Sequence, residues 1–245
     1  MEAFQRTAAV FDVDDSLLDG NCGAIFTWYL FSYRLMKDEA RRRLPRALYD
    51  YARGKLTESD MVALASRSLV GLRADELKAH ARACFLQHIK KRITREGMRA
   101  VRRHLLAGHF VLMASGSPQV IIDEVGSFLH AHASLGTRAA IREGVYTEEL
   151  LMPLVFREGK REHVRDVARR VGLDLMKSYV YSDSVADVPL FEEVEHATVV
   201  NPKTRFRAEA RRRGWTIAKW DERWQAKEGE RPEAEPADEW AGWES

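Results

Sequence analysis

The chain has 245 residues with a formal net charge of +2, and 45% of its residues are hydrophobic. This composition is typical of a globular protein, and it excludes a membrane span because the longest apolar run near the start, Ala24 to Phe31, is about half of what a bilayer requires. The near balance of charge hides an asymmetry, since Asp221 to Ser245 hold nine acidic and three basic residues and residues 1–220 therefore carry +8. A mildly basic body suits an anionic substrate.

The first predicted element is a short buried strand that ends in three carboxylates. The apolar run from Ala8 to Phe11 predicts the strand, and Asp12, Asp14 and Asp15 follow it at once. Because side chains alternate along an extended chain, we expect Asp12 and Asp14 on one side and Asp15 on the other. Two close carboxylates repel each other unless a divalent cation or a shared proton lies between them. The pattern indicates a site, although a solvated acidic loop is the alternative for this motif alone.

The stretch from Leu17 to about Thr94 predicts an all-helical insert, because apolar residues recur at helical spacing throughout it. Gly54 and Gly71 mark breaks, and Thr57 is placed to cap a helix. The predicted helices cover residues 22–36, 38–52, 57–69 and 74–93.

From Arg95 the pattern changes to alternating helices and strands. A helix that ends near Gly108 precedes the buried strand Phe110 to Ala114, which leads into the sequence Ser115-Gly116-Ser117-Pro118. Proline is favoured at the first helical position, so we expect Pro118 to open the next helix with Ser117 as its N-cap. Such a turn presents N–H groups and a hydroxyl to an anion, although an ordinary capped turn is the alternative.

The next predicted elements are a β-hairpin between Ala133 and Leu151 and a helix that begins at Gly159 and Lys160. A lysine in a first helical turn opposes the helix dipole, which suggests a use beyond stability.

A second pair of carboxylates follows the short strand Tyr179 to Tyr181, because Asp183 is placed at its tip and Asp187 four residues later. A strand from Ala197 to Val200 and an edge strand near residues 215–218 come next. Past Trp220 the composition predicts a disordered acidic tail, in which three tryptophans are isolated.

Strands that alternate with helices predict an α/β fold with an open parallel sheet, in which ligands bind beyond the carboxyl ends of the strands. One crevice at these ends can hold a set of polar residues: Asp12, Asp14, Ser115, Asp183 and Asp187. Carboxylates, a hydroxyl and the lysine form the oxygen-rich kind of site that Mg²⁺ prefers.

Four ordered motifs make the chain similar to haloacid dehalogenase superfamily phosphatases, of the subgroup that resembles phosphoserine phosphatase. The motifs are DxDx[TS] from Asp12 to Ser16, the hydroxyl turn Ser115-Gly116-Ser117, Lys160, and DxxxD from Asp183 to Asp187. The resemblance covers about residues 7–220. It implies a Rossmann-like core from residues 1–17 and 95–220, a helical cap domain from residues 18–94, and a tail from residues 221–245.

The resemblance also implies a role for each motif residue. Asp12 is the expected nucleophile, which forms an aspartyl phosphate, and Asp14 is the expected general acid and base. The expected ligands of Mg²⁺ are Asp12, the main-chain carbonyl of Asp14, and Asp183. Ser115, Gly116 and Lys160 are expected to hold the phosphoryl oxygens, and Asp187 to orient Lys160 or a metal-bound water.

Three positions depart from the family pattern. Asp15 stands where a glycine or another small or polar residue is frequent, Ser182 replaces a frequent glycine, and Ala186 replaces an asparagine of typical phosphoserine phosphatases. The predicted substrate is therefore broader than phosphoserine: a small phosphomonoester, with a phosphorylated amino acid or alcohol as the leading candidate. The alternatives are a phosphotransferase or a dehalogenase on the same fold, and a catalytically idle binding or regulatory module.

Cys22 and Cys84 lack the spacing of a metal site, and the N-terminus lacks a basic and apolar leader, which together predict a cytoplasmic protein. No nucleic-acid partner is expected, because the basic body lacks an interleaved aromatic motif. The sequence indicates neither the oligomeric state nor the residues of the insert that select the substrate.

Overall fold

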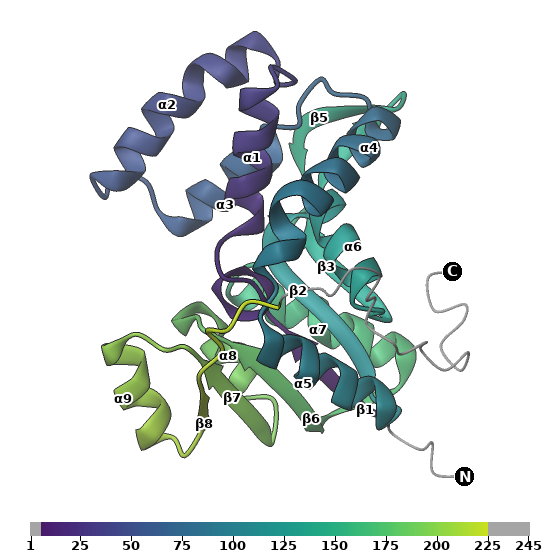
Figure 1. The fold of residues 1–245 in the computed structure, drawn as a ribbon, viewed down its shortest axis with the longest axis vertical. Coiled ribbons are helices and arrows are strands. Elements are labelled where there is room, and N and C mark those ends of the chain that lie inside the picture. Colours follow the sequence, from purple (N-terminus) through teal and green to yellow (C-terminus); the bar gives the residue numbers. More distant parts are fainter. Residues whose placement is uncertain (1–5, 225–245) are drawn as a thin grey trace.

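The computed structural model describes residues 6–224, and a six-stranded parallel sheet with the order β3-β2-β1-β6-β7-β8 lies at its centre (Figure 1). The predicted open parallel sheet is confirmed. The strands are β1 (Arg6–Phe11), β2 (Phe110–Pro118), β3 (Ala133–Thr137), β6 (Leu173–Ser182), β7 (His196–Val200) and β8 (Thr216–Ala218).

Helices cover both faces of the sheet, and the alternation of side chains along β1 explains why. Ala9 and Phe11 pack on the face of α5 (Arg95–Leu106) and α6 (Gln119–Phe128). Ala8 and Val10 point to the other face, against the remaining core helices. Those helices are α7 (Glu158–Val171), α8 (Val188–Phe191) and α9 (Thr204–Arg212). A strand with apolar residues on both faces is therefore buried in the middle of three layers.

The predicted start of the helix after β2 is wrong. Strand β2 continues to Pro118, which is paired with Thr137 of β3, and α6 begins only at Gln119. Pro118 has the extended backbone of an N-cap residue, with ψ at 136°. Ser117 is thus a strand residue and not the N-cap of the helix, and its hydroxyl is free to act elsewhere.

The predicted hairpin is partly wrong as well. Its first segment is β3, which joins the parallel sheet, and the antiparallel pair consists of β4 (Ala139–Arg142) and β5 (Val145–Leu150). Hydrogen bonds join this hairpin to the helical insert, since the N–H of Gly71 donates to the carbonyl of Tyr146 at 2.8 Å. The hairpin therefore contacts residues of the insert that lie far from it in the sequence.

Every regular element of the helical insert (residues 18–94) is helical, as predicted. In Figure 1, α1, α2 and α3 lie beyond one end of the sheet, and α2 is farthest from it. Helix α1 is shorter than expected and ends near Arg34, which has a left-handed φ of 55°, whereas α4 continues after Cys84 as a π-helical turn (Phe85–Ile89) and a 3₁₀ turn (Lys90–Arg92), close to the predicted end. The helices are α1 (Cys22–Ser32), α2 (Asp38–Ala52), α3 (Glu58–Arg67) and α4 (Ala74–Cys84).

The first residues of the predicted tail are paired with the rest of the chain. The carbonyl of Glu222 accepts a hydrogen bond from the N–H of Arg95, and the N–H of Trp224 donates to Ile93, both at 2.7 Å. The remainder of that prediction, residues 225–245, lies outside the described residues. Within residues 6–224, no helix has the length and apolar character that a membrane crossing needs.

Candidate active site

The polar motifs meet at one edge of the sheet, where parallel strands end. Asp12 follows β1, Ser115 and Ser117 lie among the last four residues of β2, and Ser182 is the last residue of β6. These three strands are neighbours in the sheet, so their carboxyl ends lie side by side. The residues that the sequence places at strand ends therefore share one crevice.

Lys160 forms a buried ion pair with two of the predicted carboxylates. Its Nζ lies 2.8 Å from Oδ1 of Asp12 and 2.7 Å from Oδ2 of Asp187. The start of α7 reaches the site because Gly159 has no side chain: a Cβ there would lie 2.1 Å from the carbonyl oxygen of Leu154. Lysine in this first helical turn serves the site, at the expense of the helix dipole.

Burial and the neighbouring charges together shift the titration of the cluster. Burial opposes the charged form of Lys160, but Asp12 and Asp187 outweigh it and raise the pKa of the ammonium. Burial raises the pKa of Asp12 well above its ordinary value, although Lys160 opposes this. Burial and the charge of Asp15 raise the pKa of Asp183 to about 6. One ammonium faces several carboxylates, so the crevice lacks positive charge.

The contacts of Ser16 show that positive charge is lacking between Asp12 and Asp183. Its hydroxyl lies 2.9 Å from Oδ2 of Asp12 and 3.2 Å from Oδ1 of Asp183. A hydroxyl has one proton, so it cannot donate to both carboxylates at once. All the atoms that are predicted to coordinate the metal are oxygens, which a hard divalent cation prefers as ligands. Among residues 6–224, no three side chains of His, Cys, Asp or Glu are placed to hold a metal, so the predicted site also depends on the main-chain carbonyl of Asp14.

Asp14 belongs to a second group of contacts, between β2 and α1. Its Oδ2 accepts hydrogen bonds from the hydroxyls of Ser115 and Ser117, each at 2.6 Å. Its Oδ1 accepts from the N–H of Cys22, the first residue of α1, at 2.6 Å. The predicted general acid is thus held jointly by the core and the insert.

The insert also covers the predicted phosphate-binding turn. A Cβ on Gly116 would lie 2.9 Å from Cγ2 of Val62, which is on α3. Glycine therefore lets the insert approach the backbone of this turn closely.

Sequence reasoning missed three hydroxyls among the described residues. The sequence indicates Ser16 only as part of the DxDx[TS] motif, and Ser117 only as a helix N-cap and as the last residue of the hydroxyl turn. Ser182 was noted only as a departure from glycine, yet its hydroxyl donates to Oδ2 of Asp187 at 2.6 Å. The position of Ser182 directly before Asp183 was the one indication of this role.

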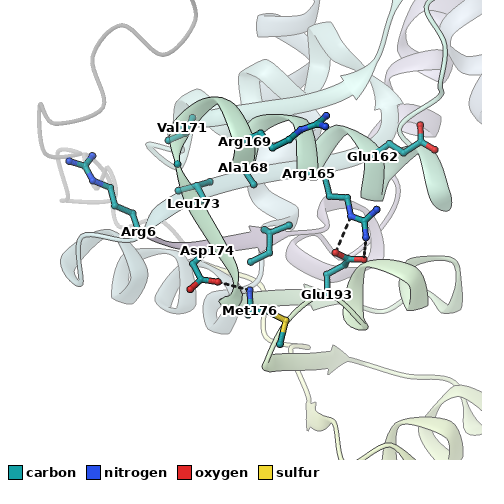
Figure 2. Close-up of a pocket in the computed structure, with 12 residues that line it drawn as sticks. Arg6, Glu162, Arg165, Ala168, Arg169, Val171, Leu173, Asp174, Met176 and Glu193 are labelled. Carbon is teal, nitrogen blue, oxygen red and sulfur yellow. Dashed lines mark hydrogen bonds and ion pairs between the residues drawn. The ribbon is translucent and has the colours of Figure 1, made fainter. Parts of the chain in front are cut away.

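A separate pocket of about 890 Å³ lies far from these residues. It is lined by Arg6 and Leu173, at the amino ends of β1 and β6, which is the edge opposite to Asp12. Figure 2 shows Arg165 on its rim, where two nitrogens of the guanidinium bind Glu193 at 2.6 and 3.0 Å. The pocket is distinct from the crevice that the motifs form.

Comparison with known proteins agrees with the motifs. The family described as haloacid dehalogenase-like hydrolase matches residues 9–192. A phosphoserine phosphatase of Mycobacterium tuberculosis (strain ATCC 25618 / H37Rv) is 31% identical over 218 residues, which are 86% of this chain and 70% of that protein. A histidinol-phosphatase of Neisseria meningitidis serogroup C (strain 8013) is 25% identical over 217 residues, 86% of this chain and 98% of that protein.

A solved structure supports the fold. A protein with unknown function from Bordetella pertussis Tohama I superposes with a TM-score of 0.79 at 30% identity, over 87% of this chain and 98% of that chain. The predicted fold class is confirmed, and the phosphatase relatives support the predicted enzyme class. Since the family match spans most of the chain, including the DxDx[TS] and DxxxD motifs, this chain belongs to the haloacid dehalogenase-like hydrolase family.

Proposed function

We propose that this hydrolase releases phosphate from a small phosphomonoester through an aspartyl phosphate on Asp12, with Mg²⁺ as cofactor. The observation that carries the proposal is the buried ammonium of Lys160, which lies 2.8 Å from Asp12 at the edge where β1, β2 and β6 end. A buried lysine beside a nucleophilic carboxylate suits an anionic substrate, because it offsets charge that both groups carry.

Asp12 attacks the phosphorus, and the bond from phosphorus to the leaving alkoxide breaks. The resulting acyl phosphate divides one difficult displacement into two easier ones. Lys160 is held in place by Asp187, which receives a second hydrogen bond from Ser182, so the ammonium needs no rearrangement to meet the phosphoryl oxygens. The hydroxyl of Ser115 and the N–H of Gly116 hold the remaining phosphoryl oxygens.

Asp14 transfers the protons. In the first step its carboxyl group protonates the leaving alkoxide, and in the second the carboxylate takes a proton from the water that attacks the acyl phosphate. Its contacts to Ser115, Ser117 and the N–H of Cys22 orient the carboxyl group at the boundary of core and insert.

Asp12, the main-chain carbonyl of Asp14, and Asp183 would hold the Mg²⁺. When bound, this ion supplies the positive charge that the cluster lacks and offsets repulsion between carboxylate and phosphate. The fit rests on the oxygen-only donor set and on the single proton that Ser16 shares between Asp12 and Asp183.

We propose that residues 18–94 act as a cap domain that selects the substrate. Val62 of α3 lies against Gly116, which supports a small enclosed space and a small substrate. The names of the two relatives point to a phosphorylated amino acid or amino alcohol. The alanine at position 186 argues against equating the substrate with phosphoserine.

The deciding experiment measures inorganic phosphate release from a panel that includes phosphoserine and histidinol phosphate, with and without Mg²⁺. We expect release that depends on the metal in the wild type, is lost in Asp12→Asn and is kept in Asp166→Asn. Asp166 is a matched control, because among residues 6–224 its carboxylate forms ion pairs with the exposed Arg169 and Arg170 of α7, away from the crevice. If the wild type and Asp12→Asn behave alike across the panel, the binding-module alternative replaces this proposal.

We also propose a cytoplasmic location. Its support is that Cys22 and Cys84 are both free thiols in buried positions, as is usual in a reducing compartment.

A further inference from the structure

We infer that Ser117 is a positioning residue, which holds the general acid Asp14 and links it to the first helix of the insert. The inference rests on the proposed function. It starts from a chain of hydrogen bonds: the N–H of Gly23 donates to Oγ of Ser117 at 3.0 Å, and this hydroxyl donates to Oδ2 of Asp14 at 2.6 Å. All three residues lie at the contact of β2 with α1.

The direction of these bonds is fixed by chemistry. An amide N–H only donates, so the hydroxyl of Ser117 accepts from Gly23 and its single proton goes to Asp14. The side chain is buried, which strengthens both bonds and leaves the hydroxyl without competing water. Ser117 therefore gives its one proton to Asp14 and accepts from the start of α1.

Ser115 and Ser117 share the same oxygen of Asp14 but differ in what else they must do. Ser115 is the proposed ligand of the phosphoryl group, and its hydroxyl must turn to the substrate when that group arrives. Ser117 has no such second duty, because its other partner is the backbone of α1. During turnover Ser117 is thus the hydroxyl that stays with Asp14.

The packing around Gly23 supports a close and specific contact. A Cβ at this position would lie 2.6 Å from Oγ of Ser117 and 3.2 Å from its Cβ. A side chain here would push the hydroxyl away from Asp14. The N–H of Cys22, one residue earlier, binds the other oxygen of Asp14, so the start of α1 reaches both oxygens, one directly and one through Ser117.

The test uses the leaving group to isolate the acid step. An alkyl phosphomonoester needs a proton on its leaving oxygen, whereas p-nitrophenyl phosphate has a leaving group that departs as the anion. The ratio kcat/KM reports the steps through formation of the acyl phosphate, so it excludes the later water attack. The variants are Ser117→Ala, the conservative Ser117→Thr and, from the other side of the bond, Gly23→Ala.

We expect Ser117→Ala to lower kcat/KM by roughly tenfold or more for the alkyl ester and by less than about threefold for p-nitrophenyl phosphate. The reason is that general acid catalysis accelerates a reaction by about 10²–10⁴-fold, and only the alkyl ester depends on it. Gly23→Ala should give the same pattern, and Ser117→Thr should restore activity toward the alkyl ester. Ser68→Ala is the control for loss of a buried hydroxyl, because within residues 6–224 the hydroxyl of Ser68 donates to the carbonyl of Ala65 in its own helix end and to no residue of the crevice.

If Ser117→Ala lowers kcat/KM equally for both esters, or for neither, the role of Ser117 is overturned. The role is also overturned if Ser117→Ala loses activity mainly toward the alkyl ester but Ser117→Thr does not restore that activity. If Ser117→Ala does not fold, Gly23→Ala decides by the same ratio. Absence of phosphate release by the wild type from both esters would contradict the proposed function itself, which distinguishes the two failures.

Discussion

Strand β1 of the core and helix α2 of the helical insert are packed very differently. In β1, the residues from Ala8 to Phe11 are all at most 1% exposed. Helix α2 buries one residue, Leu44, and its arginines pair with exposed acids such as Asp38 and Glu39. The nucleophile is thus attached to a fully buried strand, while α2 has few buried contacts to lose.

The largest expected effect contrasts one aromatic residue from each region. Phe11 is fully buried and stacks on Tyr181 at 4.7 Å, so Phe11→Ala should lower the free energy of unfolding by about 3–5 kcal/mol. Tyr49 of α2 is 52% exposed and contacts the guanidinium of Arg53, so Tyr49→Ala should change the free energy of unfolding by about 0.5 kcal/mol or less. Denaturant titration measures both, and similar losses would contradict the contrast.

A second prediction concerns His104, which is buried between α5 and the sheet. Its Nε2 lies 2.9 Å from the hydroxyl of Tyr181, and its Nδ1 lies 2.9 Å from Nδ1 of His109. Burial first, and then the neighbouring His109, Arg103 and His196, lower the pKa of His104 from 6.5 to about 3. Between these values the unfolded chain binds the proton and the folded chain does not, so stability falls as the pH falls.

The size of this effect follows from the slope of about 1.4 kcal/mol per pH unit for one proton. From pH 6.5 to pH 5 the wild type should lose at most about 2 kcal/mol through His104. The variant His104→Asn lacks this titration, and comparison of the two proteins cancels the carboxylates that titrate in both. Unfolding curves at a series of pH values measure the difference, and parallel pH profiles for the two proteins would refute it.

Part of the core and of the candidate site could be predicted from the sequence. The strand from Ala8 to Phe11 and the helix start at Lys160 were predictable, because a continuous apolar run and a lysine against the helix dipole each have few explanations. The motifs and their order also placed Asp12, Asp183 and Asp187 at one edge, where the structure has them linked through Lys160 and Ser16.

What the sequence could not show depends on partners distant in the chain. Ser117 has the residue type and position of an N-cap, and only the pairing of Pro118 with Thr137 and the approach of Gly23 assign it to the site. Ala133 to Thr137 has the local pattern of a hairpin strand, and only its fit beside β2 places it in the main sheet. Local propensity cannot encode such tertiary contacts.

The smallest effect compares two threonines that cap helices in the two regions. Thr94 caps α5 of the core: its Oγ1 accepts from the N–H of Gly97 and donates to the carbonyl of Leu17, and the residue is buried. Thr57 caps α3 of the insert, where its Oγ1 accepts from the N–H of Asp60 and the carboxylate of Asp60 binds the N–H of Thr57 in return. We expect Thr94→Ala to cost about 2 kcal/mol of global stability and Thr57→Ala about 1 kcal/mol or less.

The two substitutions should also differ in where the loss occurs. Thr57→Ala should accelerate amide hydrogen exchange within α3 while exchange in β1 stays unchanged, because α3 can loosen without opening the core. Since Val62 of α3 lies against Gly116, such loosening should alter kcat/KM more than kcat for the aryl ester if the insert gates access to the crevice. Faster exchange in β1 after Thr57→Ala would mean that core and insert unfold as one unit. The difference between β1 and α2 would then be one of packing and not of local stability.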